Sequence, residues 1–198
     1  MEQLKIDFDR VIEGLKLSEE SIDSRKKNFN QFMVNGFPNK RVEDWKFSDL
    51  NQIISSNIEN LRFHTDFETS EIDEAIFIDK FAHNKIIFLN GVISKVDFSF
   101  EDDSKVLITS DLNQNKNSKE VNPLVSLNNA LIASYIGVTV KESYSLNKPL
   151  IIYNITTKEL KSTAINLKTD IVLEKNSSLK LINLFDDNSE NNFINIVQ

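Results

Sequence analysis

The sequence predicts a mixed α and β fold, with helices in the first third of the chain and short strands after them. Apolar residues before residue 60 recur at the spacing of amphipathic helices. After about residue 84 they recur in short β-rich runs that are separated by polar turns. The chain has 198 residues, of which 40% are hydrophobic, and this is enough to form a packed core.

Three helices are expected before residue 60. The first has one apolar stripe at positions i, i+4, i+7, i+8 and i+11, formed by Leu4, Phe8, Val11, Ile12 and Leu15. The second begins at Ser18, a good N-cap, and ends at Gly36, with Pro38 following. The third begins after Ser48. Such helices can bury one another or cap a larger element.

A β-hairpin and a polar connector follow the helices. Runs 85–89 and 92–96 are rich in β-formers, and the intervening Asn90-Gly91 is a strong hairpin signal. Residues 105–109 are expected to form another strand, and the polar stretch 110–120 is a candidate internal boundary. Asn122 and Pro123 then start a helix that Gly137 is expected to close.

The last part of the chain is predicted to be a series of short strands, at 138–141, 149–155, 163–168, 170–174, 178–184 and 193–197. Apolar pairs recur every 14 residues at Ile151/Tyr153, Ile165/Leu167 and Leu179/Leu181. An antiparallel meander and a β-solenoid both fit this pattern, and the lack of Asn-Gly turns favours the solenoid. Because the chain ends inside an expected strand with no cap, we expect a truncated polypeptide.

The composition excludes several classes of function. The net charge of -7 disfavours a nucleic-acid groove, and the absence of cysteine excludes thiolate sites and disulfides. Two histidines, His64 and His83, cannot build a His-rich metal site alone. The N-terminus does not resemble a signal peptide, and no apolar run has the length of a membrane span, so a cytoplasmic location is expected.

The densest local signal lies between Gly36 and Leu50. One interpretation is a binding or catalytic cluster beside Trp45, formed by Lys40, Arg41, Glu43, Asp44 and Lys46. The favoured interpretation is that Trp45 and Phe47 pack under the helix junction while the charges pair locally on the surface. Glu43 and Asp44 are neighbours whose side chains diverge, which is poor geometry for an acid–base pair.

The segment FPNKRVEDWKFSDL at residues 37–50 resembles the signature of the SufD branch of the SufB/SufD family, the scaffold proteins of iron–sulfur cluster assembly. Three more segments are similar to that family in order and spacing. They are residues 86–92, residues 123–131, and residues 136–140 with 148–152.

The resemblance implies a non-catalytic scaffold subunit that acts with SufB and the ATPase SufC. It also implies a fold with an N-terminal helical domain at 1–84, a β-hairpin and polar connector at 85–121, and a helix with the first rungs of a right-handed parallel β-helix at 122–198. The family's SufC-binding domain and cluster site would lie beyond this chain, so no catalytic, cofactor-binding or metal-binding residue is expected here. The iron–sulfur cluster would form at the level of the complex.

The matching motif residues Glu43, Asp44, Trp45 and Lys46 are expected to be structural. Two other classes remain open from the sequence: a carbohydrate-binding or carbohydrate-cleaving β-helix of the pectin-lyase type, and a stand-alone protein-interaction module.

Overall fold

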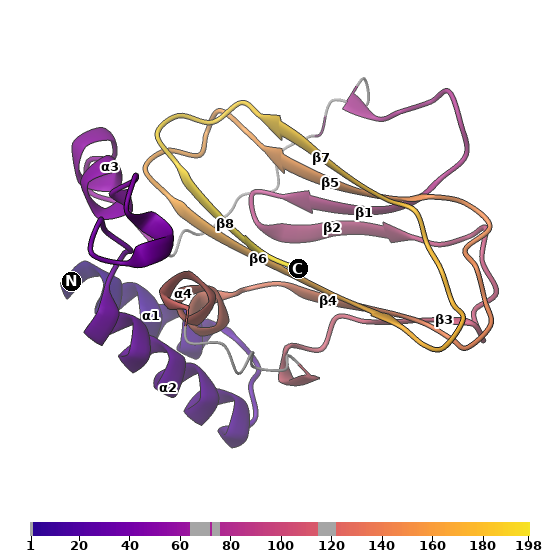
Figure 1. The fold of residues 1–198 in the computed structure, drawn as a ribbon, viewed down its shortest axis with the longest axis horizontal. Helices are drawn as coiled ribbons and strands as arrows, with labels where there is room; N and C mark the ends of the chain where they lie inside the picture. Colours follow the sequence, from indigo (N-terminus) through magenta and orange to yellow (C-terminus); the bar gives the residue numbers. More distant parts are fainter. Residues whose placement is uncertain (1, 64–71, 73–75, 115–121) are drawn as a thin grey trace.

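The computed structural model describes residues 2–63, 72, 76–114 and 122–198. Helices gather at one end of the molecule, and the strands extend away from them as two sheets (Figure 1). The predicted mixed α and β character is therefore confirmed. Parts of the expected polar connector, and His64, lie outside the described residues.

The helices begin where the sequence places their caps. The Ser18 side chain accepts a hydrogen bond from the Ser21 N–H at 3.2 Å, and the Asn122 side chain accepts one from the Leu124 N–H at 2.9 Å. The described α-helices are α1 (Glu2–Gly14), α2 (Glu19–Asn35), α3 (Leu50–Asn57) and α4 (Pro123–Leu131). Two short 3₁₀ turns are η1 (Glu43–Trp45) and η3 (Leu112–Gln114).

Helices α1, α2 and α4 share one apolar core. The rings of Phe8 and Phe29 stack with their centroids 4.1 Å apart, and Phe32 is almost fully buried. The core continues through Leu127 of α4 to Ala164, which belongs to a strand. The helical end is thus packed onto the strands through α4, which lies between the two parts (Figure 1).

The strands form two separate four-stranded sheets. The first has the order β2-β1-β5-β7 and the second β3-β4-β6-β8. In each sheet one edge strand, β2 or β3, is antiparallel to its neighbour and the other pairings are parallel. The bounds are β1 (Asn84–Leu89), β2 (Val92–Asp97), β3 (Val106–Thr109), β4 (Tyr135–Val140), β5 (Leu150–Thr156), β6 (Ala164–Leu173), β7 (Leu181–Asp187) and β8 (Phe193–Val197).

The expected right-handed parallel β-helix is wrong. The described strands form two mixed sheets, and within the described part of the chain neither sheet is closed or wound into a solenoid. The 14-residue repeat is also misleading, because its pairs face different sides: Ile165 and Leu167 lie between the sheets, whereas Ile151 and Tyr153 lie on the outer face of the first sheet. The spacing of short strands does not specify which strands pair.

The two sheets pack against each other through an apolar layer. The first sheet contributes Ile86, Phe88, Leu150 and Ile152, and the second contributes Val106, Ile136, Val138, Ile165 and Leu167. Most of these side chains are less than 5% exposed. This layer is the largest described core and fixes how the sheets face each other.

Individual elements also differ from the predictions. The runs 163–168 and 170–174 form one strand, β6, and the fourth helix ends at Leu131 rather than near Gly137. Tyr135 instead begins β4, and its ring covers Gly137: a Cβ at residue 137 would lie 2.8 Å from the Tyr135 hydroxyl oxygen. The glycine therefore makes room for a side chain within a strand. The predicted hairpin at Asn90-Gly91 is confirmed, with a register shift between Ile87 and Phe88.

Candidate interaction surface

The segment that carries the sequence motif forms a closed loop, residues 38–50, which we call the motif loop. Helix α2 stops at Gly36, which has φ +65 and whose N–H donates to the Phe32 carbonyl at 2.6 Å. Phe37 then turns into the helical core, edge-on to Phe32 at 5.1 Å. The Pro38 carbonyl accepts from the Leu50 N–H at 3.1 Å and so joins the two ends of the loop.

Inside the motif loop the backbone is organised by short-range hydrogen bonds. The Asn39 side chain accepts from the Arg41 N–H at 2.9 Å, and the Asp49 side chain caps α3 by accepting from the Gln52 N–H at 2.9 Å. Turn η1 lies between them, with the Trp45 N–H donating to the Val42 carbonyl at 2.8 Å. The loop therefore has a defined backbone although most of its side chains point into solvent.

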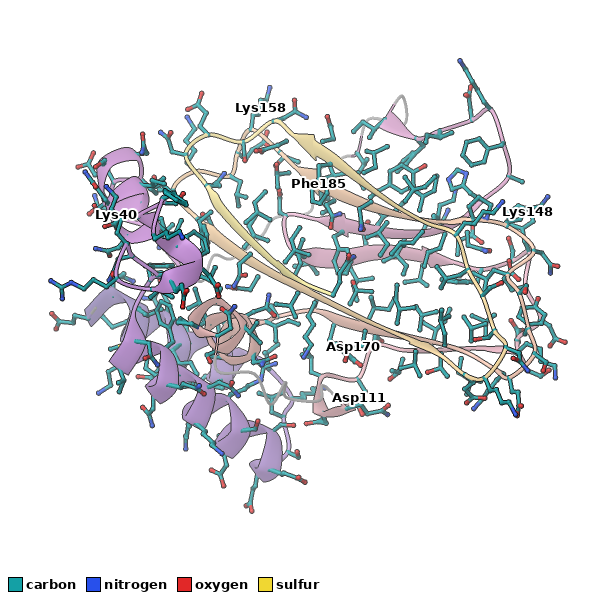
Figure 2. All side chains as sticks on the ribbon, viewed as in Figure 1. Lys40, Asp111, Lys148, Lys158, Asp170 and Phe185 are labelled. Carbon is teal, nitrogen blue, oxygen red and sulfur yellow. The ribbon has the colours of Figure 1, made fainter. Side chains whose placement is uncertain are left out.

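The predicted packing of Phe47 under the helix junction is wrong, because the Phe47 side chain is 88% exposed. Trp45 is half-buried, and the ammonium group of Lys46 lies 5.0 Å from the centroid of the Phe47 ring. Val42 in the loop and Ile53 on α3 are exposed as well. The motif thus presents apolar and cationic groups together at the helical end of the molecule, where Figure 2 labels the exposed Lys40.

The other motif residues do not assemble a reaction centre. Glu43 and Asp44 are exposed on η1, and within the described part of the chain neither forms an ion pair with Lys40, Arg41 or Lys46. The expected local charge pairing is therefore absent from these residues. What the motif loop offers chemically is a surface with a hydrogen-bonded backbone, an exposed aromatic ring and charged side chains of both signs, which suits contact with another macromolecule.

A second polar cluster lies between α4 and the second sheet. The Lys168 Nζ donates to the Asn129 side-chain oxygen at 3.1 Å, and the Tyr135 hydroxyl donates to the Asp170 carboxylate at 3.0 Å. Burial lowers the pKa of Lys168, an effect that Asp170 partly opposes. Burial, together with Asp170, raises the pKa of the Tyr135 hydroxyl well above its ordinary value. Sequence reasoning missed this cluster because Lys168 and Asn129 are 39 residues apart.

These polar groups do not line the described cavity. That cavity has a volume of about 30 Å³ and lies where α1, α4 and β6 meet, between Val11, Leu131 and Ile165. It is large enough for a water molecule and too small for an organic substrate. The buried lysine is therefore better explained as a polar contact that seats α4 on the sheet, and the Tyr135–Asp170 hydrogen bond as one that joins β4 to β6.

No family model matches the chain, and no curated protein matches it. None of the described helices combines the length and the apolar character that a membrane crossing requires. Residues 2–63, 72, 76–114 and 122–198 contain no group of three or more His, Cys, Asp or Glu side chains that could hold a metal ion.

Proposed function

We propose that this protein is a non-catalytic scaffold subunit of the SUF-type iron–sulfur cluster assembly machinery, acting in the cytoplasm in a complex with SufB and SufC. In this proposal the chain contributes protein contacts, and the cluster is assembled at the level of the complex. The proposal depends on the sequence segments at 37–50, 86–92, 123–131 and 136–152, and it does not require the β-helix that the resemblance implied.

The observation that supports the proposal best is the exposure of the motif loop. A large aromatic side chain that remains 88% exposed contributes nothing to the protein's own core. In Phe47 this exposure coincides with the segment of strongest family resemblance and with a backbone fixed at both ends. Aromatic and cationic side chains on a preorganised loop are typical of protein–protein contact sites.

A binding experiment tests the proposal. The tagged protein is mixed with purified SufB and SufC from the same cell, and complex formation is measured by pull-down and by isothermal titration calorimetry. We expect a complex with SufB. Failure of the complete protein that carries this sequence to bind either partner would overturn the proposal.

Two matched variants locate the contact. Phe47→Asp places a charge in the motif loop, and Val34→Asp does the same at an equally exposed site, 85% exposed, on α2. We expect Phe47→Asp to weaken SufB binding by at least about tenfold, as for an interface hot spot, and Val34→Asp to bind like the wild type. Equal binding by both variants would show that the motif loop is not the contact.

A further inference from the structure

The outer face of the first sheet is covered by residues 76–83, which we call the strap. Beneath the strap lie Ile87, Ile151, Tyr153 and Ile155, which form an apolar cluster with Ile76, Phe77 and Ile78. Tyr153 and Ile151 are fully buried in this arrangement. The strap therefore hides an apolar sheet face that would otherwise be open to solvent.

One hydroxyl group holds both ends of the strap. The Tyr153 hydroxyl oxygen accepts a hydrogen bond from the Ile78 N–H at 3.2 Å and lies 2.9 Å from the His83 Nε2. The ring of Phe77 packs edge-on against the Tyr153 ring with a centroid separation of 5.1 Å. Residue 78, near the start of the strap, and residue 83, at its end, thus meet at a single side chain of β5.

The hydrogen bonds assign the tautomer of His83. Its Nδ1 lies 2.9 Å from the Phe81 carbonyl oxygen, which can only accept, so Nδ1 carries the proton. Nε2 is then the acceptor, and the Tyr153 hydroxyl donates to it. All polar atoms at this point are satisfied only while the imidazole is neutral.

We infer that His83 makes the strap acid-releasable, so that protonation of Nε2 frees residues 76–83 and uncovers the outer face of the first sheet. A protonated Nε2 becomes a donor. The Tyr153 oxygen could accept from it, but the phenolic hydrogen would then have no described acceptor, because Tyr153 is fully buried. Leaving that donor unsatisfied in an apolar site favours the open strap.

Charged groups around the strap do not offset this change. Within the strap, Asp79 and Lys80 are exposed, and on β1 the ammonium group of Lys85 lies 6.0 Å from the centroid of the Phe77 ring. The neighbouring Glu101 carboxylate accepts its hydrogen bonds from other residues, one of which is Asn84. β5 contributes apolar side chains to this face, and β7 contributes Leu184 together with Asp186, which is in register with Ile155. On β2, Lys95 and Asp97 are in register with Ile87 and Lys85. No described carboxylate is hydrogen-bonded to the imidazole.

Amide hydrogen exchange of the whole protein tests the inference, with each rate corrected for the intrinsic effect of pH. Between about pH 7.5 and about pH 5.5 we expect the protection of the strap amides, Ile78 above all, to fall by about tenfold or more, while β1 amides stay protected. Protection of the strap that does not change over this range would overturn the inference.

Two variants and a spectroscopic measurement make the test specific. His83→Gln is expected to remove the pH response of the strap, and His64→Gln, which alters the other histidine, is expected to keep it. A pH response that survives in His83→Gln would contradict the inference. Should His83→Gln not fold, ¹⁵N NMR of the wild-type imidazoles decides: an Nδ1–H tautomer of His83 at neutral pH supports the inference, and an Nε2–H tautomer overturns it.

Discussion

The layer between the two sheets and the junction between the helices and the sheets are held in different ways. Between the sheets the contacts are apolar, with side chains such as Ile152 almost fully buried. At the junction, polar side chains reach the backbone of other elements. On the helical side of α4, the Arg25 guanidinium of α2 donates to the carbonyls of Ala130 and Ile132, at the end of α4, at 3.1 Å and 2.8 Å. On its strand side, the Asn128 amide of α4 donates to the Leu167 carbonyl of β6 at 2.8 Å.

The two kinds of contact make different contributions: one to the stability of the fold and one to the relative position of its elements. Apolar burial is non-directional and supplies most of the stability, so it tolerates exchange between residues of similar volume. Hydrogen bonds to named carbonyls are directional, so they fix the position of one element on another and tolerate little change. The sheet layer thus stabilises the protein, and the junction orients the helical end that displays the motif loop.

The largest effect is expected in the sheet layer. Ile152→Ala should lower the free energy of unfolding by about 3–4 kcal/mol, because it removes buried methyl groups and leaves a cavity. Urea denaturation followed by circular dichroism measures the change. The control Ile53→Ala alters an exposed residue of α3 and should stay within about 0.5 kcal/mol of the wild type. Equal losses for the two variants would show that burial between the sheets does not determine the loss of stability.

The junction is expected to be the next most sensitive region. Arg25→Ala should lower the free energy of unfolding by about 2–3 kcal/mol, because two buried carbonyls lose a charged donor. Its exposed neighbour, Lys26→Ala, serves as the control. Arg25→Met sharpens the result: a stability equal to that of the wild type would show that the apolar stem of the side chain matters and the hydrogen bonds do not.

The stabilising effect of a hydrogen-bond cluster around Glu101, at the far end of the sheets, should depend on pH. The Glu101 carboxylate accepts hydrogen bonds from Asn84, Tyr144 and the N–H groups of Asn147 and Lys148, over distances of 2.7–3.1 Å. Figure 2 places Lys148 at the end opposite the helices. Burial alone would raise the pKa of Glu101, but these hydrogen bonds outweigh it and lower the pKa.

A lowered pKa in the folded state means that Glu101 stabilises the fold above its unfolded pKa and that this contribution is lost as the pH falls through the folded pKa. Glu101→Gln should therefore lower the free energy of unfolding by about 1 kcal/mol at neutral pH and reduce the loss of stability below about pH 4.5. Urea titrations at several pH values measure both quantities. If the variant lost as much stability below about pH 4.5 as the wild type, Glu101 would not be a source of the acid sensitivity.

The smallest effect on stability is expected at the motif loop. Phe47→Ala should change the free energy of unfolding by less than about 0.5 kcal/mol, since the ring contributes little buried area. Thermal unfolding by calorimetry measures it. A clear destabilisation would place Phe47 in the junction rather than on the surface and would weaken the case for a partner contact.

Local signals in the sequence predicted the local structure. The caps at Ser18 and Asn122 and the Asn90-Gly91 hairpin each depend on a few adjacent residues, and all three are present in the structure. Long-range pairing was not predictable in the same way, because β1 pairs with β5 from more than 60 residues away. Tyr135 shows the limit clearly: its spacing from Leu131 fits a helix, but the chain leaves the helix between them.

The sequence motif predicted which residues form the candidate site. It did not predict which of their side chains are exposed or what contacts surround them. The motif identified residues 37–50, whereas the solvent exposure of Phe47 depends on how Phe37 and Pro38 close the loop. The contacts of His83 with Tyr153 and of Lys168 with Asn129 join residues 70 and 39 positions apart, and no local pattern marks them.

From β4 onward the chain alternates between the sheets, so each strand pairs with the strand two places along: β4 with β6, β5 with β7 and β6 with β8. As a result, from β4 onward the even-numbered strands belong to the second sheet and the odd-numbered strands to the first. Loss or gain of one strand would transfer every later strand to the opposite sheet and give it different strands to pair with. Insertions or deletions of two strands preserve the assignment, so length variation in this region should occur in units of two strands.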